Sequence, residues 1–211
     1  RQYADGKLRA EPQAFLDAQA RHAECYARFL QQREADLNGP RQKEALDEIA
    51  AEIENVRAAW SWAVERGEER AIDISAEGLY LFYRMRGYFQ EGTEMFGRAA
   101  EGLTGAQATA RGDEHDLIVG KVLARQGTFW YHLGRFREAD VRLRQSLTTL
   151  RRLDARGELA FALKHLGDIA RVLGNYVEAS RFLEEAIEMS ASVGDRLGQA
   201  FALLSLAGIA A

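Results

Sequence analysis

Hydrophobic residues recur along most of the chain at spacings of three and four, the spacing of one face of an α-helix. Residues 41–66 show this pattern, with apolar side chains at Leu46, Ile49, Ile53, Val56, Trp60 and Val64. Breaker residues divide the pattern into predicted helices over residues 11–37, 41–66, 70–85, 88–103, 115–133, 136–153, 157–173, 176–193 and 197–210. The pattern therefore predicts an all-α fold.

A forty-residue repeat organises the second half of the chain. The segment GRFREADVRLRQSL begins at Gly134, and GNYVEASRFLEEAI begins forty residues later at Gly174, with matching glycine, aromatic, glutamate, alanine and leucine positions. FALLSLAGIA, at residues 201–210, follows the same phase, and a weaker copy, GYFQEGTEMFGRAA, covers residues 87–100. One helical hairpin cannot bury both of its faces, so neighbouring hairpins must stack. We expect an α-solenoid.

Small residues at fixed points of the repeat predict how each hairpin packs. Gly134 and Gly174 are expected to end the first helix of a hairpin at positive φ. Gly127 or Gly167 in the first helix, and an alanine in the second, would let the two backbones approach. The expected partners in the second helices are Ala139, Ala179, Leu143 and Leu183.

Composition narrows the class further. The 211 residues are 47% hydrophobic, with two prolines and one cysteine, and the formal net charge is −4. This balance excludes a disordered chain and is not that of a nucleic-acid-binding protein. The single cysteine and the lack of a leader or a long apolar run favour a cytoplasmic setting without membrane contact. Because the chain starts without methionine and stops inside a repeat, we expect it to be a piece of a larger protein.

Catalytic motifs are not found in the sequence: neither a phosphate-binding GxxxxGK[ST] loop nor HExxH, CxxC or GxSxG occurs. His22 and Cys25 share a helical face, and residues 113–116 read DEHD, but we interpret the first as helix packing and the second as a polar loop. The arginines of residues 135–152 are interpreted as a solvated helix face. We therefore expect neither an enzyme nor a metal or other cofactor in this chain.

The repeat resembles the tetratricopeptide repeat in its longer, forty-residue version. The matching positions are Gly127, Trp130, Gly134, Phe136, Ala139 and Leu143 in one copy, and Gly167, Gly174, Tyr176, Ala179, Leu183 and Ala186 in the next. Ser146 and Tyr80 depart from the small residues of that family, and its closing proline is absent from every copy. The resemblance implies a right-handed α-solenoid of helical hairpins.

The first half of the chain carries a second resemblance. RQYADGKL, RHAECYARFL, LNGPRQKEALDEIAAEIENVRAAWSWAVERG and RGYFQEGTEMFGRAAEGL follow one another in order. This succession is similar to the region after the nucleotide-binding and winged-helix domains of bacterial STAND-class signalling ATPases, including multidomain transcription regulators. The resemblance implies that residues 1–10 end a winged-helix-like domain, that 11–69 form a helical linker hairpin, and that the repeats sense an inducer. The repeats are expected at residues 70–103, 115–153, 157–193 and, in part, 197–211.

The first helices of stacked hairpins should line a concave groove, which is where a partner is expected to bind. Counting from the repeat phase gives these candidate residues: Lys121, Thr128, Tyr131, His132, Phe161, Lys164, Asp168, Arg171, Phe201, Leu204, Glu77 and Arg84. Aromatic side chains beside lysine and arginine suit a partner with apolar groups and carboxylates. Packing between repeats is the alternative role for Phe161 and Phe201.

These patterns favour a non-catalytic sensor that binds a protein or peptide inducer and thereby releases the ATPase domain, which it contacts within the same protein, from autoinhibition. That mechanism is implied by the STAND resemblance. A constitutive protein-protein interaction scaffold is the alternative, and a small-molecule inducer sensor is another. The identity of the inducer, the number of further repeats, the effector domain and the oligomeric state are not given by the sequence.

Overall fold

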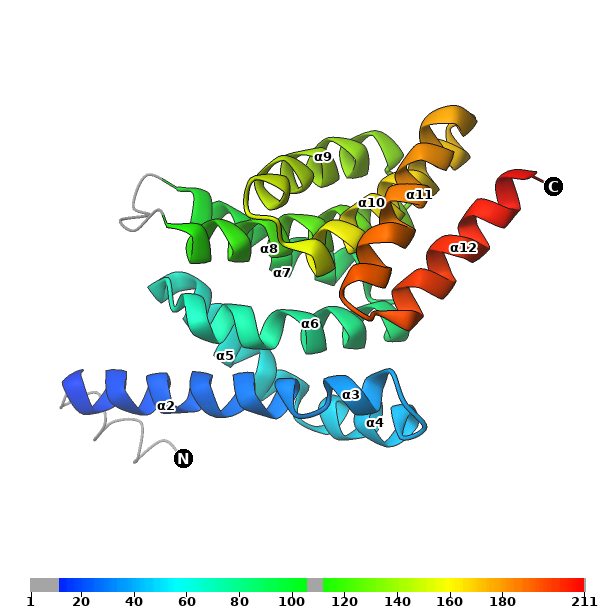
Figure 1. Cartoon of the computed structure of the whole chain (residues 1–211). Helices are drawn as coiled ribbons and strands as arrows, with labels where there is room; N and C mark the ends of the chain where they lie inside the picture. The colour runs from blue at the N-terminus through cyan, green and yellow to red at the C-terminus, as the bar shows by residue number, and fades with distance from the viewer. Residues whose placement is uncertain (1–11, 106–111, 211) are drawn as a thin grey trace. The chain divides into compact units, whose positions relative to one another are not determined.

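A computed structural model describes residues 12–105 and 112–210 of the chain. Every regular element in these residues is a helix, as the hydrophobic pattern predicts (Figure 1). Packing divides the chain into two compact units, Arg1–Arg86 and Gly87–Ala211. The expected winged-helix trace at residues 1–10 lies outside the described residues. The domain ranges expected from the sequence were set by the phase of the repeat, whereas these two units are defined by packing. The expected ranges therefore stay a prediction.

The first unit contains helices α2 (Pro12–Gln31), α3 (Glu34–Leu37), α4 (Gln42–Ala51), α5 (Ile53–Arg66) and α6 (Glu69–Arg86). Helix α2 packs against both α5 and α6, and α3 packs against α4 and α6. The predicted helices over residues 11–37 and 41–66 are each broken in two, so these two predictions are wrong about continuity.

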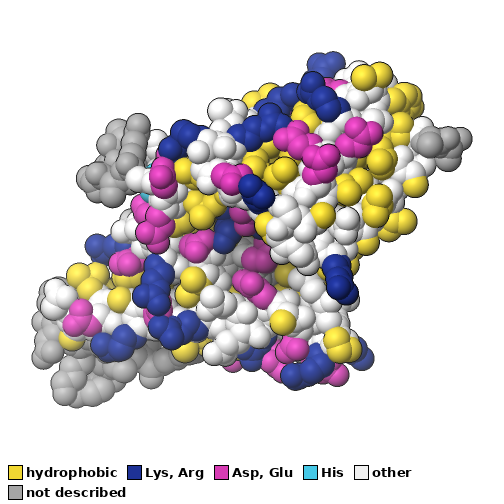
Figure 2. Space-filling model, viewed as in Figure 1, with side chains coloured by type: hydrophobic (Ala, Val, Ile, Leu, Met, Phe, Trp, Pro, Cys, Tyr) yellow, Lys and Arg dark blue, Asp and Glu magenta, His cyan; other side chains and the backbone are white. Residues whose placement is uncertain are grey.

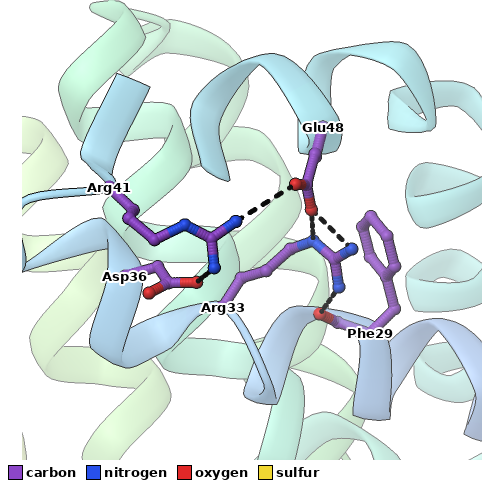
Figure 3. A network of polar contacts seen from close by, with 5 residues as sticks. All are labelled: Phe29, Arg33, Asp36, Arg41 and Glu48. Carbon is purple, nitrogen blue, oxygen red and sulfur yellow. Dashed lines mark hydrogen bonds and ion pairs between the residues drawn. The ribbon is translucent and has the colours of Figure 1, made fainter. Parts of the chain in front are cut away.

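The first break, after Gln31, is fixed by a polar network around Arg33 (Figure 3). The guanidinium of Arg33 donates to the carboxylate of Glu48 at 2.7 and 2.8 Å and to the carbonyl oxygen of Phe29 at 2.9 Å. It also lies 3.5 Å from the centroid of the Phe29 ring. Arg41 joins Glu48 to Asp36 on α3. The network holds the end of α2, α3 and α4 together in the bent arrangement.

The second break, at Glu52, is fixed by a tyrosine from α2. Tyr26 donates a hydrogen bond from its hydroxyl to Glu52 Oε2 at 2.7 Å, and Asn55 Nδ2 donates to the same oxygen at 2.7 Å. The hydrogen bond from Tyr26 is the main cause of the lowered pKa of Glu52, and the bond to Asn55 lowers it further. The same bond to Glu52 raises the pKa of Tyr26.

Replacing Tyr26 with phenylalanine is expected to raise the pKa of Glu52 towards the ordinary glutamate value of 4.5, because the strongest hydrogen bond to the carboxylate is lost. In the wild type, the bond stabilises the fold above pH 4.5, and its contribution is lost as pH falls through the lowered pKa of Glu52. At the alkaline end it is lost as pH rises through the raised pKa of Tyr26. Carboxyl NMR titration measures the change. The smaller rise expected for Asn55→Ala is the matched control, and an unchanged Glu52 pKa in Tyr26→Phe would contradict the assignment.

The second unit is a series of consecutively packed helices, which agrees with the helical repeat seen in the sequence (Figure 1). The helices are α7 (Phe89–Thr104), α8 (Asp113–His132), α9 (Phe136–Arg152), α10 (Arg156–Val172), α11 (Tyr176–Ser192) and α12 (Arg196–Ala210). Their predicted ends are confirmed to within two residues. Asp113 was expected in a loop, but it belongs to the first turn of α8, where it and Asp116 are ion-paired with Arg152.

Glycine sets the close approach of the two helices in each hairpin, as the repeat pattern predicts. A Cβ atom on Gly167 of α10 would lie 2.6 Å from Leu183 Cγ and 3.3 Å from the carbonyl oxygen of Ala179 on α11. A Cβ on Gly127 would meet Leu143 Cγ at 2.8 Å in the preceding hairpin. The side chain that departs from the pattern, Ser146, is fully buried and donates to the carbonyl oxygen of Gly120 at 2.7 Å. That hydrogen bond satisfies the buried hydroxyl.

The turns within these hairpins follow one geometry. Gly134 and Gly174 have φ values of 74° and 81°, which confirms the positive φ predicted for both. The next amide in each turn donates back across the helix end, from Arg135 to Trp130 O at 2.9 Å and from Asn175 to Ala170 O at 2.8 Å. This is the Schellman arrangement, in which the glycine lets the chain reverse and satisfies the last carbonyl groups of the helix.

Successive first helices lie closer together than successive second helices. Helix α10 contacts both α8 and α12. Helices α9 and α11 are instead bridged by long side chains, through Arg144–Glu178 at 3.0 Å and Arg151–Glu185 at 2.6 Å. Because of this closer approach, we expect α8, α10 and α12 to lie on the inner side of the second unit. Among the described helices, none combines the length and apolar character needed to cross a membrane.

Candidate partner-binding site

Helices α8 and α10 bring together four of the side chains that the repeat phase predicts for the groove: Tyr131, Lys164, Asp168 and Arg171. Lys164, Asp168 and Arg171 recur along one stripe of α10 at spacings of four and three, and Tyr131 comes from the last turn of α8. The charges of Asp168 and Arg171 both affect the pKa of Tyr131. These four side chains are therefore close together on the fold, and their role in binding a partner stays a prediction.

Asp168 is the acidic member of the cluster. Its side chain is only 6% exposed and accepts an ion pair from Lys164 Nζ at 2.8 Å, one helical turn earlier. A buried carboxylate requires such a partner because an uncompensated charge away from water is costly. The pairing neutralises Lys164 and fixes its ammonium group on the α10 surface.

Tyr131 is half-buried beside this pair. Burial is the main cause of its raised pKa, and the negative charge of Asp168 adds to the rise, while Arg171 opposes it. The phenol therefore remains protonated at neutral pH and can donate a hydrogen bond to a bound carboxylate or carbonyl oxygen.

Arg171 is the uncompensated charge of the cluster. It is half-buried, and its Nε atom is buried without a hydrogen-bond partner among the described residues. Within the described part of the chain, no carboxylate forms an ion pair with it. The buried Nε is closed to a ligand, so a partner would reach only the two terminal nitrogens, which make no hydrogen bond in the described residues and suit a carboxylate.

A buried ion pair that the sequence reasoning missed connects the same two helices. Arg125 on α8 is 4% exposed and binds Glu158 on α10 through both terminal nitrogens. Its guanidinium lies 4.2 Å from the ring centroid of Phe161, and that ring lies 4.4 Å from the ring of His165. The only sequence signal was an arginine inside the apolar stretch KVLARQGTFW of residues 121–130.

Three other predicted residues of α8 have different surroundings. Thr128 is fully buried and donates from its hydroxyl to Ala124 O at 3.0 Å, so its prediction as a groove-lining residue is wrong. His132 is exposed and stacks on Phe89 at a centroid distance of 4.7 Å. Lys121 is half-buried in the middle of the helix.

Phe161 is half-exposed and packs against the core of the second unit, which agrees with the packing role weighed for it, while its role in partner binding stays a prediction. Phe201 and Leu204 on α12 are 46% and 69% exposed. Glu77 and Arg84 belong to α6 in the first unit, where the Arg84 guanidinium lies 5.8 Å from the centroid of the Tyr80 ring. The predicted residues of α8 and α10 therefore belong to the second unit, and Glu77 and Arg84 belong to the first.

Metal-binding geometry is not found in the residues that the structure describes: they contain no group of three or more histidine, cysteine or acidic side chains placed to hold an ion. His22 lies against Tyr26 of the same helix at a ring-centroid distance of 4.8 Å, and Cys25 is exposed.

A scan against protein-family models and a search of curated proteins each found no match to the chain.

Proposed function

We propose that this chain is a non-catalytic sensing module that binds a protein or peptide inducer on the inner face of its second unit. The half-buried Arg171, whose guanidinium has no ion-pair partner in the described residues and lies near Tyr131 and the Lys164–Asp168 pair, is the observation that carries this proposal. The inducer would present a carboxylate to Arg171 and an apolar side chain to Phe161 and Tyr131.

The hairpin packing supports a tetratricopeptide-like assignment. Gly127 and Gly167 take equivalent positions against Leu143 and Leu183, and the turns at Gly134 and Gly174 share one geometry. These are the positions at which the sequence resembles that repeat. A right-handed superhelix of such hairpins, with its first helices lining the groove, is part of the proposal.

The role within a STAND-type signalling ATPase rests on the sequence of the first unit. The segment EIENVRAAWSWAV resembles the helical linker of that class and forms the Glu52 break and most of α5 here. In this proposal the repeats restrain the ATPase in the same protein until the inducer binds. A linker of this kind favours a sensor over a constitutive scaffold.

Changing both Lys164 and Arg171 to glutamate is expected to abolish retention of the inducer, because two cations of the site become anions that repel its carboxylate. The measurement is a pull-down from bacterial lysate, with and without phage infection, followed by titration calorimetry with the recovered partner. Arg171→Gln alone, which leaves the buried Asp168 paired with Lys164, should weaken binding by about tenfold.

The matched control reverses two exposed arginines elsewhere in the second unit, Arg98 and Arg196, giving the same change in net charge. Circular dichroism of each variant establishes that it is folded. Loss of the partner by the groove variant and its retention by the control supports the proposal. Equal retention by both variants would rule out this face as the binding site.

A further inference from the structure

A second surface of the same unit has features of a binding site and lies on the second helices, α9 and α11. Each helix begins beside a solvent-open hollow. One, of about 320 Å³, is lined by Trp130, Arg137, Glu138, Val141, Arg142 and Gln145. The other is a shallow, open depression at the start of α11, bordered by Gly174, Asn175, Tyr176, Val177, Glu178 and Arg181. We name these two hollows together the outer strip.

The two hollows lie about one repeat apart in the sequence, and each is lined by a valine, a glutamate and arginine. Glu178, which borders the second hollow, forms an ion pair with Arg144 on α9 at 3.0 Å, so α9 lies beside that hollow. Each contains a valine and an arginine one helical turn apart, in opposite order. Arg137 precedes Val141, whereas Val177 precedes Arg181. The repeat period of forty residues aligns these pairs position by position.

The arginines of the outer strip differ from their neighbours in charge compensation. Arg144 and Arg151 on α9 are paired with carboxylates of α11, and Arg152 is paired with carboxylates of α8. In the described residues, by contrast, no carboxylate lies within ion-pair distance of Arg137, Arg142 or Arg181. Arg142 donates a hydrogen bond to the amide oxygen of Gln145 at 3.3 Å, and its guanidinium lies 5.2 Å from the centroid of the Trp130 ring. The arginines of α9 and α11 therefore divide into a group paired with carboxylates and a group, Arg137, Arg142 and Arg181, that is not. Glu138 and Glu178 also line the hollows, and they are paired with Arg135 and Arg144.

Apolar side chains are unusually open to solvent along the same strip. Val177 is 90% exposed, and Val141 and Tyr176 are 57% and 56% exposed. A β-branched residue gains little from an exposed helix position, where a charged or straight-chain residue forms helix more readily. Figure 2 shows hydrophobic side chains at the surface near the turn that joins α10 to α11, with basic side chains beside them. Exposed apolar groups next to uncompensated cations mark a surface that gains by being covered.

From this combination we propose that the outer strip docks an acidic peptide segment with interspersed apolar side chains, supplied by a partner protein. Its carboxylates pair with Arg137, Arg142 and Arg181, and its apolar side chains cover Val141 and Val177. Charge complementarity selects an acidic partner. Two adjacent open hollows suit a continuous segment with a side chain in each, since a single small ligand is better enclosed by one deep pocket.

This inference is independent of the proposed inducer site, because it uses different helices and shares no residue with the cluster of α8 and α10. A peptide-display selection on the full chain tests it, and the selected sequences are then synthesised and measured by fluorescence anisotropy. The test variant carries Arg137→Glu and Arg181→Glu, and a milder one carries glutamine at both positions. Both arginines are exposed and make no hydrogen bond in the described structure, so the variants are expected to fold.

The expected result is a set of peptides rich in aspartate and glutamate with apolar residues between them. Their affinity should fall by at least about tenfold in the charge-reversed variant and decline as salt is raised. The Arg98→Glu, Arg196→Glu control should change it by no more than about twofold. Failure to select any peptide would overturn the inference, as would neutral or basic peptides. Peptides lost only with Lys164→Glu, Arg171→Glu would also overturn it, while supporting the inducer site.

Discussion

Replacing Gly167 with valine is expected to lower the free energy of unfolding of the second unit by about 2–3 kcal/mol. The added Cβ would lie 2.6 Å from Leu183 Cγ and 3.3 Å from the carbonyl oxygen of Ala179. Since the second contact is with backbone, α10 and α11 must move apart, and the packing between them is lost. Urea unfolding followed by circular dichroism measures the change.

Gly157 supplies the matched control within the same helix. A Cβ atom added to Gly157 would have no neighbouring atom within 4 Å, and the φ of this residue is not in the left-handed region. Gly157→Ala should therefore stabilise the unit slightly, by about 0.5 kcal/mol, because alanine is the better helix former. If both glycine variants moved the unfolding midpoint alike, close helix approach at Gly167 would not be what stabilises the hairpin.

Replacing Arg125 with methionine is expected to cost about 3 kcal/mol of stability. The change leaves the Glu158 carboxylate, only 20% exposed, without its arginine, and it removes the guanidinium from the face of Phe161. Breaking a buried pair from one side is costly because the remaining charge is uncompensated. Thermal and urea unfolding of the full chain measure the loss.

The double variant Arg125→Met, Glu158→Leu separates the charge effect from the loss of packing. It is expected to recover most of the stability, because an apolar pair of similar volume needs no compensation. A double-mutant cycle gives the coupling between the two side chains. If the double variant were as unstable as the sum of the two single variants, the ion pair would not be the reason for the loss.

The hairpins were predictable from the sequence because their determinants are local and repeated. The glycine of each turn and the small residue of each first helix recur every forty residues. Gly174 is therefore equivalent to Gly134, and Gly167 to Gly127, and each pair predicts the same packing. Repetition also gave the stripe of α10 that carries Lys164 and Asp168.

The breaks in the first unit were not predictable because they depend on residues far apart in sequence. Arg33 reaches Glu48 across 15 positions, and Tyr26 reaches Glu52 across 26. The helical spacing of apolar residues runs through both breaks without a signal. Tertiary hydrogen bonds decide the local backbone there.

The candidate site was predictable in outline but not residue by residue. Repeat phase treats Thr128 and Asp168 as equivalent, yet a small hydroxyl satisfied by its own helix is buried completely, whereas Asp168 is held at the site by Lys164. Arg125 was missed because its partner, Glu158, lies 33 residues away on the next hairpin. The phase of a repeat predicts on which face of the helix a residue lies, whereas the neighbouring side chains determine how deeply that residue is buried.

Site-specific photocrosslinking to the partner recovered by pull-down tests the central claim, that the inner face of α8 and α10 binds the inducer. A photoreactive phenylalanine analogue replaces Tyr131 in one variant, and Val193, which is 48% exposed and lies outside both proposed surfaces, in another. We predict crosslinked partner from position 131 and none from position 193. Crosslinking from position 193 alone, or equal yields from both positions, would contradict the assignment of this face as the inducer site.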